Sequence, residues 1–496
     1  MRWTSFAALI LTLAACGGGG DTASWKESGA KCATPRSGVD PTTGKAYPDK
    51  AGSLDNEKAW LKSWTDDTYL WYGEVPSVDA SKYSSATAYF DQLRTTAKTA
   101  SGNDKDRFHF WDTTAHWEQL SQSGVEAGYG MTVSLISASP PRKVVVAYNE
   151  PGSPAAAQNV TRGVEILTVD GVDVVNATGQ ANVDALNAGL FPQALNQQHT
   201  FTLKDLNGAQ RQVTLTSVNV TSTPVQNVHT LDTASGKVGY MLFNDHLATA
   251  EKGLIDAVNQ LKTAGIADLV IDMRYNGGGY LAIASELAYM IAGPAKVSGK
   301  FFEQLAFNDK HPAVDPVTGD QLSPTPFYNT SLGLSASNGA ALPSLGLPRV
   351  FVLTGGGTCS ASESVLNGLA GVDVQVIQVG ATTCGKPYGF YPQDNCGITY
   401  FSIQFKGVNA KGFGDYADGF VPGAATAGSL AGCKVADDFG HALGDAAEAR
   451  LAAALAYRAS PTCPAPSSSS AAVLGGVFGE GQVVKSIWQQ NRILRR

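Results

Sequence analysis

The pattern of hydrophobic and polar positions changes along the chain and predicts three folded regions, of which the first is helical. Between residues 53 and 117, aromatic side chains recur among residues that favour helices. Trp60 and Trp64 lie one helical turn apart and would share a helix face. A stacking platform for a ligand is one interpretation of this pair, but burial against neighbouring helices is the commoner role. We therefore predict a small helical N-terminal region over residues 53–117.

Short runs rich in β-branched residues follow between residues 124 and 222 and predict a region made of strands. Asn207 and Gly208 stand between the last two runs and are a strong hairpin signal. We therefore predict a small β-domain over 124–222. Its expected strands are 131–136, 143–147, 163–169, 200–203 and 212–216.

Strands alternate with helices from residue 228 onward, which predicts an α/β domain over 228–460. Residues 237–243 and 267–272 read as buried strands, and 247–264 between them reads as an amphipathic helix. Such a βαβ unit implies a parallel sheet. The remaining elements expected here are helices over 280–291 and from about 361, and strands over 349–354, 374–379 and 399–405. The Ser-rich residues 464–496 are predicted to be a disordered tail.

The first residues predict export. Arg2 precedes an apolar run from Phe6 to Ala15 that is too short to span a membrane and is typical of a secretory signal. The run ends in Leu13-Ala-Ala-Cys16, which resembles a bacterial lipobox and implies cleavage before Cys16 and acylation of its thiol. A plain signal peptide cleaved nearby is the alternative. We expect a signal over 1–16, a flexible tether over 17–52 and a lipid anchor in the bacterial cell envelope, at the periplasm or the cell surface, with the outer membrane favoured.

Composition excludes some classes of function. The chain has 496 residues, 36 basic against 43 acidic, and a formal charge of −7, without basic clusters interleaved with aromatics. A nucleic-acid partner is therefore not expected. After Cys16, six cysteines remain in an exported chain, which predicts disulfides. Cys384 and Cys396 are near enough in sequence to suggest a local pair, and because no two cysteines have zinc-knuckle spacing, we predict neither a metal site nor a cofactor.

The candidate chemistry lies in the run Thr354-Gly-Gly-Gly-Thr-Cys-Ser-Ala-Ser-Glu363. This run leaves a buried strand, turns through three glycines and enters a helix. A serine there sits at the positive end of the helix dipole, among N–H groups that can bind a developing oxyanion. The residues alone leave open whether Ser360 or Ser362 is the nucleophile, since Ser362 could also cap the helix.

These residues resemble the carboxyl-terminal processing proteases, which carry a Ser-Ala-Ser-Glu element. In that family the nucleophile lies three residues before the glutamate, which implies Ser360, and the catalytic lysine follows a glycine about one strand later, which implies Lys386. Residues 271–279 resemble the family's Asp-x-Arg-x-Asn strand end and glycine turn. The resemblance implies a ClpP/crotonase-like α/β core. It also implies an oxyanion hole from the N–H groups of Ala361 and Gly278, with Gly279 as a less favoured alternative.

The β-domain resembles a PDZ domain. Its signatures are Pro151–Ala155, Gly163–Gly171 and a segment that resembles the carboxylate-binding loop, formed by Gly128, Tyr129, Gly130 and Met131. Glycines expose backbone N–H groups that can hold a terminal carboxylate while a peptide adds as a strand to the sheet edge. The resemblance therefore implies binding of protein or peptide C-terminal tails. A β-domain with glycine turns and no ligand is the alternative.

The mechanism implied is a serine peptidase with a Ser-Lys dyad. A lysine with a pKa near ~10.4 cannot take the serine proton at neutral pH, so Lys386 must be desolvated, which can lower a lysine pKa by up to ~3–5 units. Many family members carry an orienting glutamine four residues after the lysine, where this chain has Phe390. His246, after the strand 237–243, is the competing base, although a capping role is commoner there. A catalytically inert, lipid-anchored peptide-binding scaffold and a serine esterase are the alternative functions.

Overall fold

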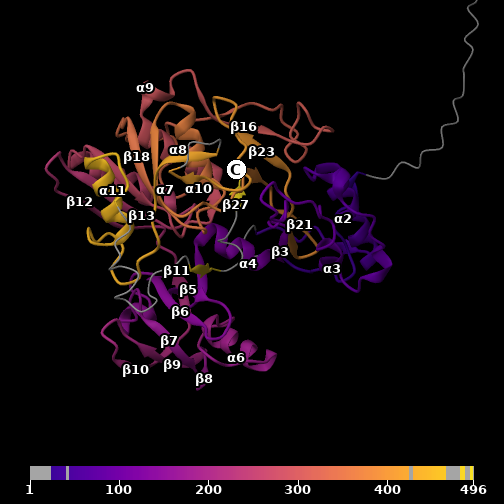
Figure 1. Ribbon diagram of the computed structural model, residues 1–496. Helices are drawn as coiled ribbons and strands as arrows, with labels where there is room; N and C mark the ends of the chain where they lie inside the picture. Colours follow the sequence, from indigo (N-terminus) through magenta and orange to yellow (C-terminus); the bar gives the residue numbers. More distant parts are fainter. Residues whose placement is uncertain (1–23, 41–43, 424–427, 465–480, 486–491, 495–496) are drawn as a thin grey trace, which may run out of the picture.

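The computed structural model describes residues 24–40, 44–423, 428–464, 481–485 and 492–494, which form an N-terminal region, a β-domain and an α/β core (Figure 1). The predicted signal segment 1–16, with Cys16, lies outside the described residues. Among the residues described, no helix combines the length and the apolar character needed to cross a membrane.

The N-terminal region is mainly helical and packs its aromatic side chains inward. Helix α2 (Leu54–Thr68) begins at Ser53, whose hydroxyl accepts a hydrogen bond from the Asn56 amide. The rings of Trp60 and Trp64 stack with centroids 5.6 Å apart, and both are buried. The pair therefore serves packing. The other elements of this region are α3 (Ala86–Phe90), β3 (Phe110–Thr113) and α4 (Thr114–Glu118).

Part of the predicted flexible tether 17–52 is folded instead. Its described residues form α1 (Trp25–Ser28) and the paired strands β1 (Lys31–Cys32) and β2 (Lys50–Ala51). Trp25 is buried and donates from its indole nitrogen to Asp67 at 2.8 Å. A disulfide joins Cys32 to Cys396 in the α/β core. Burial of the indole and the covalent link hold this segment on the folded body.

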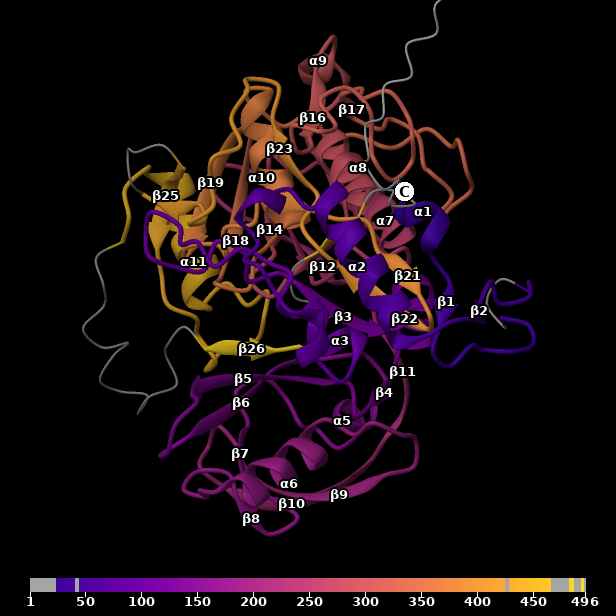
Figure 2. The ribbon, with the colours of Figure 1, turned by 90° about the vertical axis from the view of Figure 1, so that its right-hand side faces the viewer.

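The β-domain is built on an antiparallel sheet in the order β10-β9-β7-β6-β5-β26 (Figure 2). The expected hairpin is present, because β9 and β10 pair antiparallel and Gly208 adopts φ +85° in the turn. Helix α6 (Gln180–Leu190) covers one face of the sheet. The strands are β5 (Met131–Ser137), β6 (Lys143–Asn149), β7 (Glu165–Val169), β9 (Gln198–Lys204) and β10 (Gln210–Thr216), with β4 (Val125–Gly128) and β11 (Val218–Thr221) forming a separate pair.

The predicted disordered tail 464–496 is wrong for two short stretches. Strand β26 (Gln482–Val484) pairs antiparallel with β5 at the edge of the β-domain, and β27 (Arg492–Leu494) pairs parallel with β15 (Gly278–Tyr280) in the α/β core. The composition of residues 464–496 does not predict these two strands, because each forms by pairing with a strand from a distant part of the chain.

The α/β core contains the predicted parallel sheet, in the order β12-β13-β14-β18-β19-β25-β24. Pairs from β13 to β24 are parallel, and β12 joins antiparallel. Helices α7 (Ala250–Thr263), α8 (Leu281–Ala292) and α10 (Ala361–Gly371) cover one face, while α11 (Ala449–Ala459) covers the other. The strands are β12 (Val225–Leu231), β13 (Val238–Phe243), β14 (Asp268–Asp272), β18 (Arg349–Thr354), β19 (Gln375–Gly380), β24 (Val421–Pro422) and β25 (Ser429–Lys434).

The parallel pairing places the candidate residues at one edge of this sheet. His246 follows β13, Gly278 follows β14, Ser360 follows β18 and Lys386 follows β19, and these four strands are neighbours in that order. Since the carboxyl ends of parallel strands share an edge, the four loops converge there. The predicted strand 399–405 is divided into β22 (Ile398–Phe401) and β23 (Phe405–Val408), which belong to different sheets.

Candidate active site

Ser360 occupies a strained position at the start of α10. Its backbone has φ +62° and ψ −119°, a region that non-glycine residues rarely adopt. The residue is completely buried, and among the described residues its Oγ has no hydrogen-bond partner. A buried hydroxyl without a partner is costly in a purely structural role. The backbone strain and the unsatisfied hydroxyl both point to a chemical role at Ser360.

Lys386 is fully buried beneath aromatic side chains. Its Nζ lies 4.1 Å from the ring centroid of Phe390 and 5.0 Å from that of Phe108. Phe390 occupies the position where many carboxyl-terminal processing proteases have glutamine. An apolar ring face therefore replaces an amide beside the amine, which keeps water away from it.

Glu363 connects the segment of the serine to the segment of the lysine. Its carboxylate accepts hydrogen bonds from the backbone N–H groups of Ser360 (2.9 Å), Gly385 (2.8 Å) and Lys386 (2.8 Å), and from the hydroxyl of Thr383 (2.5 Å). Burial raises the pKa of Glu363 above its ordinary value, and the four donors partly offset this effect. This role of Glu363 was not predicted from the sequence, although Ser360 and Glu363 have the Ser-x-x-Glu spacing of a capping box.

A disulfide between Cys359 and Cys384 makes the same connection covalently. The expected pairing of Cys384 with Cys396 is therefore wrong, while the expectation of disulfides is confirmed by three bonds, the others joining Cys32 to Cys396 and Cys433 to Cys463. The loops after β18 and β19 meet because these strands are neighbours, which brings Cys359 next to Cys384. The short sequence separation of Cys384 and Cys396 therefore did not predict the disulfide pairing.

The two candidate oxyanion donors lie on loops that Asn276 holds together. Gly278 donates its N–H to Asn276 Oδ1 at 2.9 Å, and Ala361 is the first residue of α10, where backbone N–H groups have no partner within the helix. Ser362, the other candidate nucleophile, donates its hydroxyl to the Asn276 carbonyl at 3.0 Å. Gly279 adopts φ +140° and approaches His246 so closely that an added Cβ would lie 2.4 Å from the His246 carbonyl oxygen.

His246 lies beside this loop but is a poor base. It is fully buried, and its Nδ1 is 3.0 Å from Asn276 Oδ1. Burial lowers the pKa of His246 to about 3, and the hydrogen bond to Asn276 offsets only part of that effect. An imidazole of such low proton affinity gives little driving force for removing a proton from serine.

The Asp-x-Arg-x-Asn motif supports the site from behind. Arg274 forms a buried network with Asp272, Asp437 and Glu448 at 2.6–2.9 Å. Arg162 extends this network into the β-domain, since it donates to Asp437 at 2.8 Å. The network therefore couples the β-domain to the loop that carries Gly278, and Arg162 was not singled out by its sequence.

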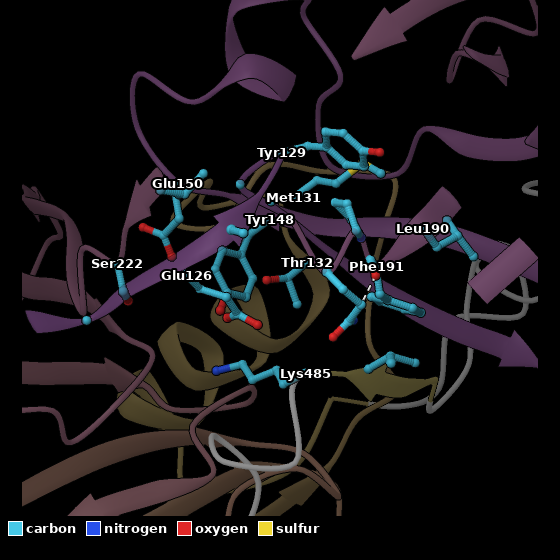
Figure 3. A pocket seen from close by; sticks show the side chains of 18 residues that line it. Glu126, Tyr129, Met131, Thr132, Tyr148, Glu150, Leu190, Phe191, Ser222 and Lys485 are labelled. Atoms are coloured by element: carbon cyan, nitrogen blue, oxygen red, sulfur yellow. Dashed lines mark hydrogen bonds between the residues drawn. The ribbon is translucent and has the colours of Figure 1, made fainter. Parts of the chain in front are cut away.

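The predicted peptide-binding loop borders a pocket of about 130 Å³ in the β-domain (Figure 3). Tyr129 is buried and donates its hydroxyl to the Gly189 carbonyl at the end of α6, at 3.1 Å, while Gly130 adopts φ +71° and Met131 begins β5. In Figure 3, Lys485 lies across the pocket from Tyr129 and Met131. The wall opposite the loop is thus made by the C-terminal segment of the same chain.

Comparison with known proteins confirms the family resemblance. The sequence model of Peptidase family S41 matches residues 237–389, and that of the Peptidase S41 N-terminal domain matches residues 56–110. A carboxyl-terminal-processing protease of Picosynechococcus is 29% identical over 174 residues, which are 34% of this chain and 39% of that relative. The chain thus aligns with about two fifths of this curated relative's length.

The fold is likewise similar to a solved structure. A crystal structure described as an S41 protease from Bacteroides fragilis superposes with a TM-score of 0.60 at 22% identity, covering 84% of this chain and 98% of the other. At this identity the likeness establishes the fold. The predicted α/β class is confirmed at this level.

Proposed function

We propose that this chain is a serine endopeptidase that cleaves exported proteins or peptides near their C-termini. The matches of residues 237–389 and 56–110 to the Peptidase S41 sequence models support this proposal. Ser360 is the proposed nucleophile and Lys386 the proposed general base. The observation that carries the proposal is the double connection between their segments, one through the carboxylate of Glu363 and one through the Cys359–Cys384 disulfide.

In the proposed mechanism, the buried amine of Lys386 takes the proton of Ser360 Oγ as that oxygen attacks the scissile carbonyl. The amine then returns the proton to the leaving nitrogen, and water hydrolyses the acyl-enzyme. The N–H groups of Ala361 and Gly278 bind the oxyanion, for which Gly278 must exchange its bond to Asn276 for one to the substrate. Losing one such donor costs about 3 kcal/mol of transition-state stabilisation.

We assign the β-domain as a PDZ domain that binds substrate tails, and the core as ClpP/crotonase-like. The glycine loop 128–131 precedes β5, whose outer side is paired with β26 in this structure. A peptide that replaced β26 could add there as a strand, with its carboxylate bound by backbone N–H groups of the loop. The lipobox at Cys16 supports a lipid anchor in the cell envelope, which would hold the enzyme near exported substrates.

The test is cleavage of casein and of tail peptides by the purified, lipid-free protein, together with labelling by a serine-reactive phosphonate. Ser360→Ala and Lys386→Ala should each abolish cleavage. Ser364→Ala, on the same helix, and Lys411→Ala, an exposed lysine, serve as matched controls that should retain it. Tail binding without turnover by the wild type would support an inert scaffold, and ester cleavage indifferent to peptide length would support an esterase. If Lys386→Ala cleaved the substrate and Ser360→Ala did not, His246 would become the base to test.

A further inference from the structure

The C-terminal segment of the chain occupies the edge of the β-domain at which a peptide would bind. Strand β26 pairs antiparallel with β5, with Val484 opposite Val133, Val483 opposite Ser134 and Gln482 opposite Leu135. Because β5 begins at Met131, directly after the glycine loop, β26 runs toward that loop in the chain direction. A bound substrate tail would take this edge and this direction.

Side chains of this segment pack against both the β-domain and the α/β core. Val484 packs into the core of the β-domain and lines its pocket, whereas Val483 packs against the core cluster of the α/β domain. Alternation along a strand explains how neighbouring residues reach opposite faces. The segment therefore lies between the two domains and contacts both.

Lys485 fastens the segment to the loop that leads to the active site. Its buried amine donates to the Asn244 carbonyl at 3.0 Å and lies 3.2 Å from a carboxylate oxygen of Asp245. His246, the next residue, pairs through its backbone with Gly279. Asp245, which Lys485 contacts, is thus one residue before His246, whose backbone pairs with the candidate oxyanion loop at Gly279.

A second described stretch of the C-terminal part of the chain lies at the candidate active site. Strand β27 pairs parallel with β15, which places Arg492 opposite Gly278 and Leu494 opposite Tyr280. It also contacts α10, which follows Ser360, and β20 (Tyr388–Gly389), which follows Lys386. All three segments that carry the proposed catalytic groups therefore border this strand, and both Ser360 and Lys386 are completely buried.

We infer that residues 481–485 and 492–494 belong to an autoinhibitory segment, which covers the peptide edge of the β-domain and the active site in the manner of a substrate tail. This inference rests on the proposed peptidase function. Because the segment is tethered, it competes at an effective concentration of about millimolar. A free tail at micromolar concentration gains access only after the segment is displaced.

Two measurements test the inference. The first compares tail-peptide cleavage by the full chain, by a chain ending at residue 464 and by Lys485→Glu, which places a carboxylate beside Asp245. Both altered chains should show kcat/KM at least tenfold higher. Gln482→Glu, an exposed position on the same strand, is the matched control and should behave like the full chain. Unchanged rates in both altered chains would overturn the inference.

The second measurement is independent of catalysis. A fluorescent peptide of residues 481–496 is titrated into the Ser360→Ala chain ending at residue 464 and into full-length Ser360→Ala, with anisotropy as the readout. Saturable binding to the shortened chain and at least tenfold weaker binding to the full chain are expected, even if the proposed peptidase activity fails. Absence of binding to the shortened chain refutes the inference. Mass spectrometry that finds the segment removed from wild type but intact in Ser360→Ala would make it a substrate and overturn its inhibitory role.

Discussion

Replacing Glu363 with glutamine tests whether its carboxylate positions the proposed dyad. One carboxylate oxygen accepts from the N–H groups of Ser360 and Lys386, and the other from Gly385 and the Thr383 hydroxyl. Glutamine keeps the shape but offers one accepting oxygen. The hydroxyl of Thr383 can rotate to accept from the new amide, so at least one N–H, that of Gly385, loses its partner.

The magnitude follows from the cost of orphaned donors. Each buried N–H without a partner costs about 1–3 kcal/mol, and a hydrogen bond to a charged acceptor is stronger than one to a neutral acceptor. With one or two donors orphaned, we expect Glu363→Gln to lower the free energy of unfolding by about 2–4 kcal/mol. A displacement of the lysine segment by about 1 Å would also lower kcat on the order of 10²-fold.

The assay is urea unfolding followed by tryptophan fluorescence, combined with steady-state cleavage of a tail peptide. The matched control is Asp373→Asn, beyond the other end of α10, where the exposed carboxylate pairs with Lys411 at 2.6 Å and Lys300 at 3.3 Å. Such surface pairs contribute about 0–1 kcal/mol, so the control should change little. If Glu363→Gln matched the control in both unfolding free energy and kcat, the positioning role would be refuted.

Three further predictions concern stability. Replacing both Cys359 and Cys384 with serine should lower the free energy of unfolding by about 3 kcal/mol, by loop-closure entropy, and reduce cleavage; a fully active variant would contradict the clamp. Burial raises the pKa of Glu150 from 4.5 to about 7, with Asp245 adding to the effect and Lys485 opposing it. Protonation of Glu150 therefore contributes about 3 kcal/mol to the free energy of unfolding below pH 4.5, and this contribution is lost as the pH rises through about 7. Urea unfolding at several pH values should show this decline in the wild type but not in Glu150→Gln. Arg162→Ala should cost about 3–5 kcal/mol in urea unfolding, because it leaves Asp437 short of a buried partner, and a loss below 1 kcal/mol would argue against that coupling.

Local patterns were sufficient for most elements. The βαβ periodicity around 237–272 predicted a parallel sheet because buried parallel strands read as continuous apolar runs, and Asn207-Gly208 predicted its hairpin because glycine tolerates positive φ. The strand 399–405 was predicted as one element, because nothing in the local sequence marks the point at which the chain passes from the sheet of β22 to the sheet of β23.

Contacts between distant segments could not be predicted in this way. The Cys359–Cys384 bond and the four donors around Glu363 depend on β18 and β19 being neighbours, which is a property of the sheet order. The folded part of the tether depends on Cys396, 364 positions from Cys32. Neither spacing nor composition records such pairings.

The sequence by itself determined the types of residue available for chemistry, Ser360 at a helix start and Lys386 after a glycine, because these depend on local turns and helix ends. The tertiary structure decided what surrounds them: aromatic rings over the lysine, Glu363 between the two segments, and strands β26 and β27 along the proposed peptide edge and the candidate active site. The physical reason is that hydrogen-bonding edges and buried faces accept any segment of suitable shape, and only the folded chain shows which segment reaches them.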